Sequence, residues 1–258
     1  MAQLQFTADN FYSYILVLAR ISAIVFFNPV ISRSQVSFAV KTAAAAGISL
    51  LLMPFTGITC DIVNIPELLL CITSELAVGF VLAYVFNIYF YMLSFAGDII
   101  DEQSGLLMGR VFDPLSGTAQ SVTGKLLHIL FLVYIFITNS HLVFIRLLIS
   151  SYDTVSAGMS GLSLQSVSQY GIELFISVFS LAVRLAVPFI AAALIVETGM
   201  GILMRLIPEF NMFVMNMQIK IIVFMIVMLA MAKPVTVFLE NYIISMFDSM
   251  QRSLCSLV

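Results

Sequence analysis

Residues Tyr170–Met204 read YGIELFISVFSLAVRLAVPFIAAALIVETGMGILM, and the polar stretch RLIPEFNMFVMNMQIK, Arg205–Lys220, connects them to a second apolar run that ends near Ala232. The first run carries Arg184 and Glu197 far from its ends. Because lipid offers neither water nor hydrogen-bond partners, such charges must find their partners within protein. The sequence therefore predicts a hairpin of two apolar helices whose polar turn is a candidate contact surface.

The composition is that of a membrane protein with several spans. Of the 258 residues, 61% are hydrophobic and only 10% are charged, and the mean hydropathy is +1.09, far from the values of a soluble domain. The net charge of -3 gives no basic face for nucleic acid. The sequence has no HExxH, GxSxG or Walker-type glycine loop, and its three cysteines form no CxxC pair. We therefore expect no enzyme activity, metal site or cofactor.

Six apolar stretches approach or exceed the roughly 20 residues that a membrane helix needs, which predicts an all-α fold of about six helices. They are Phe11–Phe27, Phe38–Phe55, Ile65–Ala96, Leu126–Ile149, Tyr170–Met204 and Ile219–Ala232. Among the connections between them, only the first, third and fifth carry Lys or Arg, so the positive-inside rule places both termini outside and the Arg205–Lys220 turn in the cytoplasm.

Two of these stretches are too long for a bilayer. As continuous helices, Ile65–Ala96 and Tyr170–Met204 would each reach roughly 50 Å, whereas the hydrocarbon core is about 30 Å thick. Gly79 and Pro188 are positions where these helices could bend. We expect other protein chains to cover much of both helices.

Five ionisable residues lie well inside apolar segments: Arg20, Glu75, Arg146, Arg184 and Glu197. A lone charge at that depth costs about 3 kcal/mol even on the lenient insertion scale, so we expect each residue to be paired or to face a wet cavity. Interhelical ion pairs that fix the packing are the preferred interpretation. A relay for protons or ions is the alternative.

The longest polar insertion is DIIDEQSGLLMGRVFDPLSGTAQSVTGK, Asp98–Lys125. It is too rich in glycine for a regular helix and too apolar for a plain solvated loop. It is either a loop folded back into an assembly or an ordinary cytoplasmic connection. We divide the chain into residues 1–125, which include this loop at about 98–124, residues 126–169 with the fourth helix, and residues 170–258 with the hairpin and an amphipathic tail.

The polar turn also carries a recognisable signature. It follows the pattern G-x-L-x-R-x-x-P-x-x-N-x-F with a later Lys, formed by Gly201, Leu203, Arg205, Pro208, Asn211, Phe213 and Lys220. This pattern resembles the C-terminal signature of the FliR family of flagellar type III export gate components, whose injectisome relatives form the SctT family. Further matches are ELAVGFVLAYVFN from Glu75, GDIIDEQSG from Gly97 and NSHLVFIRLLISSY from Asn139.

The resemblance implies a structural and gating subunit of the flagellar protein export channel. Such a subunit winds with FliP and FliQ into a helical hetero-oligomer in the inner membrane, at the flagellar basal body, with FlhB at its cytoplasmic entrance. Unfolded substrates pass through the pore that the assembly forms. The C-terminal half would then be a FliQ-like hairpin whose turn contacts partners through Arg205, Pro208, Asn211, Phe213 and Lys220.

The resemblance further implies that the glycine-rich loop plugs the closed channel. The plug residues would be Gly105, Met108, Gly109, Phe112, Asp113, Pro114 and Gly117. Three other functions stay open. One is an injectisome export gate subunit of the SctT type, and another is an ion-coupled secondary transporter whose binding site would contain Glu75, Arg146 and Glu197. The third is a self-assembling channel of identical subunits.

Overall fold

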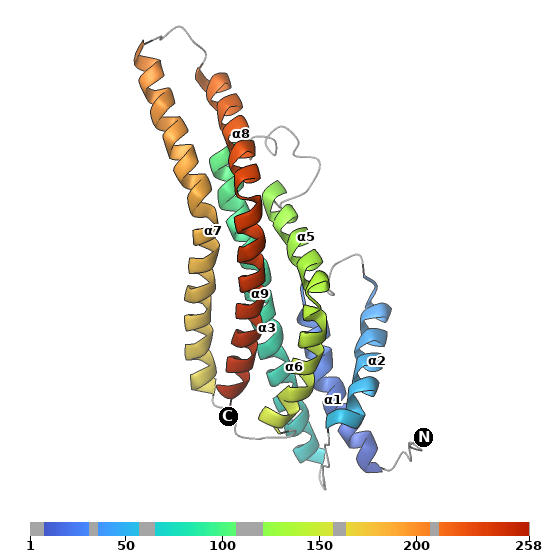
Figure 1. The fold of residues 1–258 in the computed structure, drawn as a ribbon. Helices are drawn as coiled ribbons and strands as arrows, with labels where there is room; N and C mark the ends of the chain where they lie inside the picture. The colour runs from blue at the N-terminus through green and yellow to red at the C-terminus, as the bar shows by residue number, and fades with distance from the viewer. Residues whose placement is uncertain are drawn as a thin grey trace. The chain divides into compact units, whose positions relative to one another are not determined.

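The structure is a computed structural model, which describes residues 8–30, 36–56, 65–106, 121–156, 164–206 and 212–257. These residues form helices and no strand, so the predicted all-α class is confirmed. The helices are α1 (Ala8–Phe27), α2 (Phe38–Thr56), α3 (Ile65–Ser104), α5 (Val122–Ile137), α6 (Ser140–Thr154), α7 (Leu164–Leu206), α8 (Met212–Ala230) and α9 (Ala232–Cys255) (Figure 1).

Two of the six predicted apolar stretches are parts of bent helix pairs. The stretch Leu126–Ile149 falls on α5 and α6, which meet at an angle of 75°. The break lies at Asn139, whose φ of 56° is left-handed, a conformation that Asn adopts more readily than most residues. The last stretch lies mostly in α8, which meets α9 at 61°.

The described helices do not confirm the count of six apolar segments that the sequence predicts. By length and composition, three of the described helices can cross a membrane, or five if each bent pair counts as one span. The difference comes from the first stretch, because the apolar part of α1, Phe11–Phe27, is shorter than a full span.

The two overlong stretches are continuous helices. α3 has 40 residues, and α7 has 43 residues and runs through Pro188 without a break. At about 1.5 Å per residue they extend roughly 60 Å, twice the thickness of the hydrocarbon core of a bilayer, about 30 Å. The bilayer alone therefore cannot have set their length.

The described residues belong to two compact units that interleave along the chain. Unit 1 comprises Met1–Tyr89, Asn139–Phe175 and Ile244–Val258, and unit 2 comprises Phe90–Thr138 and Ile176–Ile243. The long helices α3, α7 and α9 contribute to both units. The three-part division drawn from the sequence follows the chain and stays a prediction.

In unit 1, α1 packs closely against α3 because Gly79 has no side chain. A Cβ atom built on Gly79 would overlap the backbone carbonyl oxygen of Arg20 and press on Ala23. One helix end is also fixed here, since the Asn87 side chain donates to the carbonyl of Phe27 in the last turn of α1, a group that has no partner within its own helix.

In unit 2, α7 and α8 form the predicted hairpin and lie side by side (Figure 1). Its core consists of Ala186 and Phe189 from α7, Phe224 from α8 and Ile100 from α3. The rings of Phe189 and Phe224 lie 5.7 Å apart between centroids. The core therefore joins the hairpin to the C-terminal part of α3.

The close approach at Gly79 gives a prediction with a matched control. Gly79→Ala is expected to destabilise the purified chain by about 1–3 kcal/mol, because α1 and α3 must move apart. Gly47→Ala in α2 has no atom within 4 Å of the new methyl group and is expected to be neutral or to stabilise by up to about 1 kcal/mol through helix propensity. Thermal denaturation of both variants in detergent measures the difference, and equal midpoints would contradict the packing argument.

Candidate functional site

Among the described residues, the most deeply buried charges form an ion pair between α1 and α3. Arg20 is 0% exposed and Glu75 is 1% exposed. The Nε atom of Arg20 lies 2.6 Å from Oε2 of Glu75, and Nη2 lies 3.1 Å from Oε1. Two parallel hydrogen bonds of this kind make the strongest and most directional geometry available to Arg and a carboxylate.

Helix α6 satisfies the rest of the guanidinium group. Nη1 of Arg20 donates to Oγ of Ser151 at 3.0 Å, and Nη2 donates to the backbone carbonyl of Val155 at 3.1 Å. The guanidinium carbon lies 3.9 Å from the ring centroid of Tyr152, within the range of a cation–π contact. A single side chain therefore links α1, α3 and the end of α6.

The surroundings of Arg20 and Glu75 are those of a structural ion pair and not of a proton or ion relay. Four hydrogen bonds and one aromatic face occupy the guanidinium group, which has five N–H donors in all. Removing two charges from water costs several kcal/mol per ion, so such a pair contributes to a unique helix register more than to net stability. The geometry favours the ion-pair interpretation over a relay for these two residues.

The chain does not bury the other three ionisable residues singled out in the sequence. Arg146 and Arg184 are exposed on the surface of the chain. Nζ of Lys220 lies 2.5 Å from Oε1 of Glu197, whose side chain is 45% exposed. Glu197 is therefore paired with a cation, whereas the side chains of Arg146 and Arg184 lie on helix faces turned away from the core of the chain itself. Their burial stays a prediction for an assembled state.

Both carboxylates of the charge set proposed for a transporter are paired with other cations. Glu75 is held by Arg20, and Glu197 is held by Lys220. Arg146 lies on the face of α6 opposite the buried one, which contains Leu147, Leu148, Ser151 and Tyr152. Each carboxylate thus has its own cation.

A second polar cluster joins the end of α3 to the start of α5 in unit 2. The Asp101 carboxylate is 2% exposed and accepts from the backbone N–H of Val122 at 2.6 Å, from the backbone N–H of Thr123 at 3.3 Å and from the hydroxyl of Thr123. Backbone N–H groups in the first turn of a helix have no partner in the helix itself, and the helix dipole favours an anion there. Asp101 therefore fixes the start of α5.

Two glycines allow this junction to close. A Cβ atom on Gly97 of α3 would overlap the backbone of Gly124 in α5. Ser121 caps α5 in the usual way, with its Oγ accepting from the N–H of Gly124 at 3.1 Å. The residues on both sides of segment 107–120 are thus joined to each other. Gly97 and Asp101 lie in the motif GDIIDEQSG, but nothing in their spacing shows that they contact residues 122–124.

Most of the predicted plug lies outside the described residues. Gly105 is described and has a φ of +80° directly after α3, a left-handed conformation that favours glycine. The residues Met108, Gly109, Phe112, Asp113, Pro114 and Gly117 lie outside the described ranges. The plug assignment stays a prediction.

The predicted cytoplasmic turn is described at its two ends. Arg205 is exposed in the last turn of α7, and Pro208 and Asn211 lie outside the described ranges. Phe213 lies in α8, but its side chain is not described. Lys220 connects α8 to α7 through Glu197.

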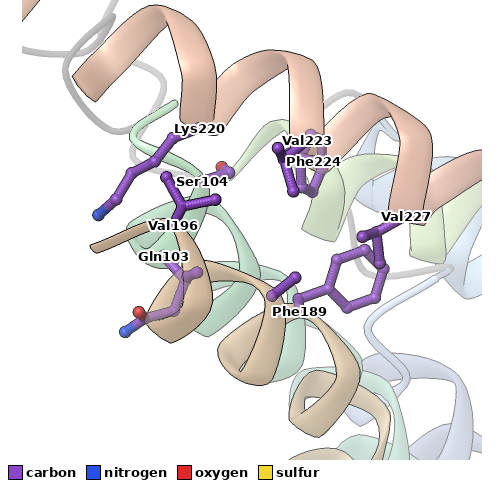
Figure 2. Close-up of a pocket in the computed structure, with 10 residues that line it drawn as sticks. Gln103, Ser104, Phe189, Val196, Lys220, Val223, Phe224 and Val227 are labelled. Carbon is purple, nitrogen blue, oxygen red and sulfur yellow. The ribbon is translucent and has the colours of Figure 1, made fainter. Parts of the chain in front are cut away.

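Lys220 also lines a small pocket formed by α3, α7 and α8. Figure 2 shows Lys220 and Gln103 at one end of this pocket and Phe189 and Val227 at the other. The pocket is thus apolar inside and polar at one end. Its walls are the same helices that form the core of unit 2.

The sequence matches the family model described as "Bacterial export proteins, family 1" over residues 11–246. The chain belongs to this family. The match covers both polar clusters, the ion pair of Arg20 and the cap formed by Asp101.

The curated relatives come from flagella and from injectisomes. The chain is 22% identical to flagellar biosynthetic protein FliR of Bacillus subtilis, with 97% of each chain aligned. It is 24% identical to FliR of Escherichia coli over 95% of each chain. It is 28% identical to Yop proteins translocation protein T of Yersinia pestis over 81% of each chain. The resemblance to the FliR family and its injectisome relatives is confirmed.

The ion pair predicts an asymmetric response to mutation. Arg20→Met leaves the Glu75 charge buried without a partner and is expected to lower the free energy of unfolding by about 3–5 kcal/mol. The double variant Arg20→Met/Glu75→Leu is expected to recover most of that loss, because no uncompensated charge remains.

Thermal denaturation of the purified chain in detergent measures these changes. Arg146→Met is the matched control, since the same substitution falls on an exposed Arg and is expected to leave the midpoint almost unchanged. A double variant as unstable as Arg20→Met would contradict the assignment.

Proposed function

We propose that this export-family protein is a structural and gating subunit of the flagellar type III protein export channel and helps to form the pore through which unfolded flagellar substrates leave the cell. The observation that carries the proposal is the family match over residues 11–246, together with flagellar relatives aligned over nearly the whole chain. This role needs no catalytic group, because the subunit would contribute helices that line a pore.

The exposed surface of the helices supports an assembled state. In unit 2, Ile195 of α7 is 74% exposed and Leu229 of α8 is 76% exposed. In unit 1, Leu51 of α2 is 69% exposed and Ile65 of α3 is 77% exposed. Helices of roughly 60 Å have more apolar length than a bilayer covers. Partner chains would cover the remainder.

The proposed partners are FliP-like, FliQ-like and FlhB-like chains in the inner membrane, at the flagellar basal body. The α7–α8 hairpin supports a FliQ-like role for the C-terminal half, with the Arg205–Lys220 turn as a cytoplasmic contact. The interhelical ion pairs support a scaffold over a transporter, because Glu75 and Glu197 each have a cation of their own.

The injectisome is the second candidate, supported by the likeness to Yop proteins translocation protein T. Deleting the chain in its native organism separates the two. A flagellar subunit is required for filament formation and swimming. Normal swimming combined with loss of effector secretion would assign the chain to an injectisome.

Co-expression tests the proposed assembly. We expect a tagged form of this chain to recover FliP-like and FliQ-like chains as a stable complex in mild detergent. The lone chain in liposomes is the comparison, and we expect it to show no solute uptake. Ion-coupled uptake by the lone chain, without any complex, would contradict the export-gate function and favour a transporter.

The plug proposal is tested at its glycines. Replacing Gly105, Gly109 or Gly117 by a large or charged residue is expected to raise the leak of ions through the assembled gate, because the loop can no longer pack into the closed channel. Gly47→Leu is the control, since Gly47 lies in α2 with nothing within 4 Å of its Cβ position. Conductance at the wild-type level in every plug variant would remove the plug assignment.

A further inference from the structure

The middle of α7 presents a cation on an exposed apolar surface. Arg184 is exposed, and Val187, Ala191 and Ile195 follow it at spacings of three, seven and eleven residues and are exposed as well. These spacings place all four side chains on one side of an α-helix. We name this surface of unit 2, defined by these four residues, the Arg184 face.

The part of the chain that the structure describes pairs Arg184 with no anion. Among the described residues, no carboxylate lies within the 4.0 Å ion-pair distance of its guanidinium group. Glu197, thirteen residues further along α7, is about 20 Å away along the helix axis and is paired with Lys220.

Neither lipid nor water suits the Arg184 face. Arg184 lies twenty residues from the first residue of α7 and twenty-two from the last, which is roughly 30 Å from either end. Where the bilayer covers the middle of α7, Arg184 lies in hydrocarbon, and a lone cation there is costly. In water, Val187 and Ile195 would instead remain as exposed apolar surface. A protein partner satisfies both kinds of group.

We infer that the Arg184 face binds an apolar helix of another export-apparatus chain that carries an Asp or Glu side chain opposite Arg184. The chemistry of the face sets the chemistry of the partner: apolar side chains cover Val187, Ala191 and Ile195, and one carboxylate neutralises the guanidinium. Ala191 is small enough for a helix to approach closely. The inference rests on the proposed function, since it takes the partner from the export apparatus.

Arg184→Met tests the inference without disturbing the fold, because Arg184 lies on the surface of the isolated chain. In the complex this change leaves the partner carboxylate buried without a counter-ion, which weakens the interface. We expect recovery of the FliP-like and FliQ-like chains by the tagged subunit to fall by about tenfold or more. Arg184→Lys is expected to retain part of the recovery. If the Arg184 face contacted lipid alone, Arg184→Met would not lower the recovery of partner chains, because Met is less costly in lipid than Arg.

The controls separate this inference from the proposed function. Arg252→Met alters an exposed Arg in the last turn of α9 and is expected to leave recovery unchanged. If the wild-type chain recovers no partner, the proposed function fails. If the wild type and Arg184→Met recover partners equally well, the proposed function stands and the Arg184 face is not an interface.

A suppressor selection identifies the partner. Arg184→Glu places two like charges together, and random mutagenesis of the co-expressed chains is expected to restore the complex through an Asp or Glu changed to Lys or Arg within an apolar segment of a partner. Restoring changes confined to this chain would overturn the inference. They would include the case in which a second copy of the chain supplies the carboxylate.

Discussion

The need to neutralise Arg20 inside an apolar helix organises unit 1. Once the guanidinium group is buried, Glu75 must lie beside it, and Ser151 and Val155 must supply the remaining acceptors. Those partners lie on α3 and at the end of α6, so a single side chain fixes the register of three helices. Gly79, one turn beyond Glu75 on α3, lets α1 come close enough for the pair to form.

In unit 2, Asp101 is also a buried charge that must be stabilised within protein, but its partners among the described residues include no cation. Its carboxylate takes its stabilisation from the free N–H groups at the start of α5, where the helix dipole favours an anion. The glycines at positions 97 and 124 bring the two backbones together. The two helices on either side of segment 107–120 are thereby joined to each other.

The buried charges and the exposed charge of Arg184 on α7 differ in where their partners lie. The charges of Arg20, Glu75 and Asp101 fix the internal packing, and all three are buried with partners within the chain. Arg184 is exposed in the middle of an apolar helix, which is the position expected of a charge whose partner lies on another chain.

Much of this protein could be read from its sequence. The lengths of the apolar runs predicted the helices, and the signature from Gly201 to Lys220 indicated the family, because hydropathy and local motifs depend on neighbouring residues alone. Even the bend at Asn139 is local, yet the sequence did not reveal it, since Asn is compatible with a helix interior as well as with a left-handed break.

Only the tertiary structure determined which charges meet. Arg20 and Glu75 are 55 residues apart, and Asp101 and Val122 are 21 apart, and no periodicity relates such distant positions. The five ionisable residues look alike in sequence, since each interrupts an apolar run. Whether such a residue faces the core of the chain or its surface depends on how the helices rotate against one another, and that rotation is set by the packing of the whole unit.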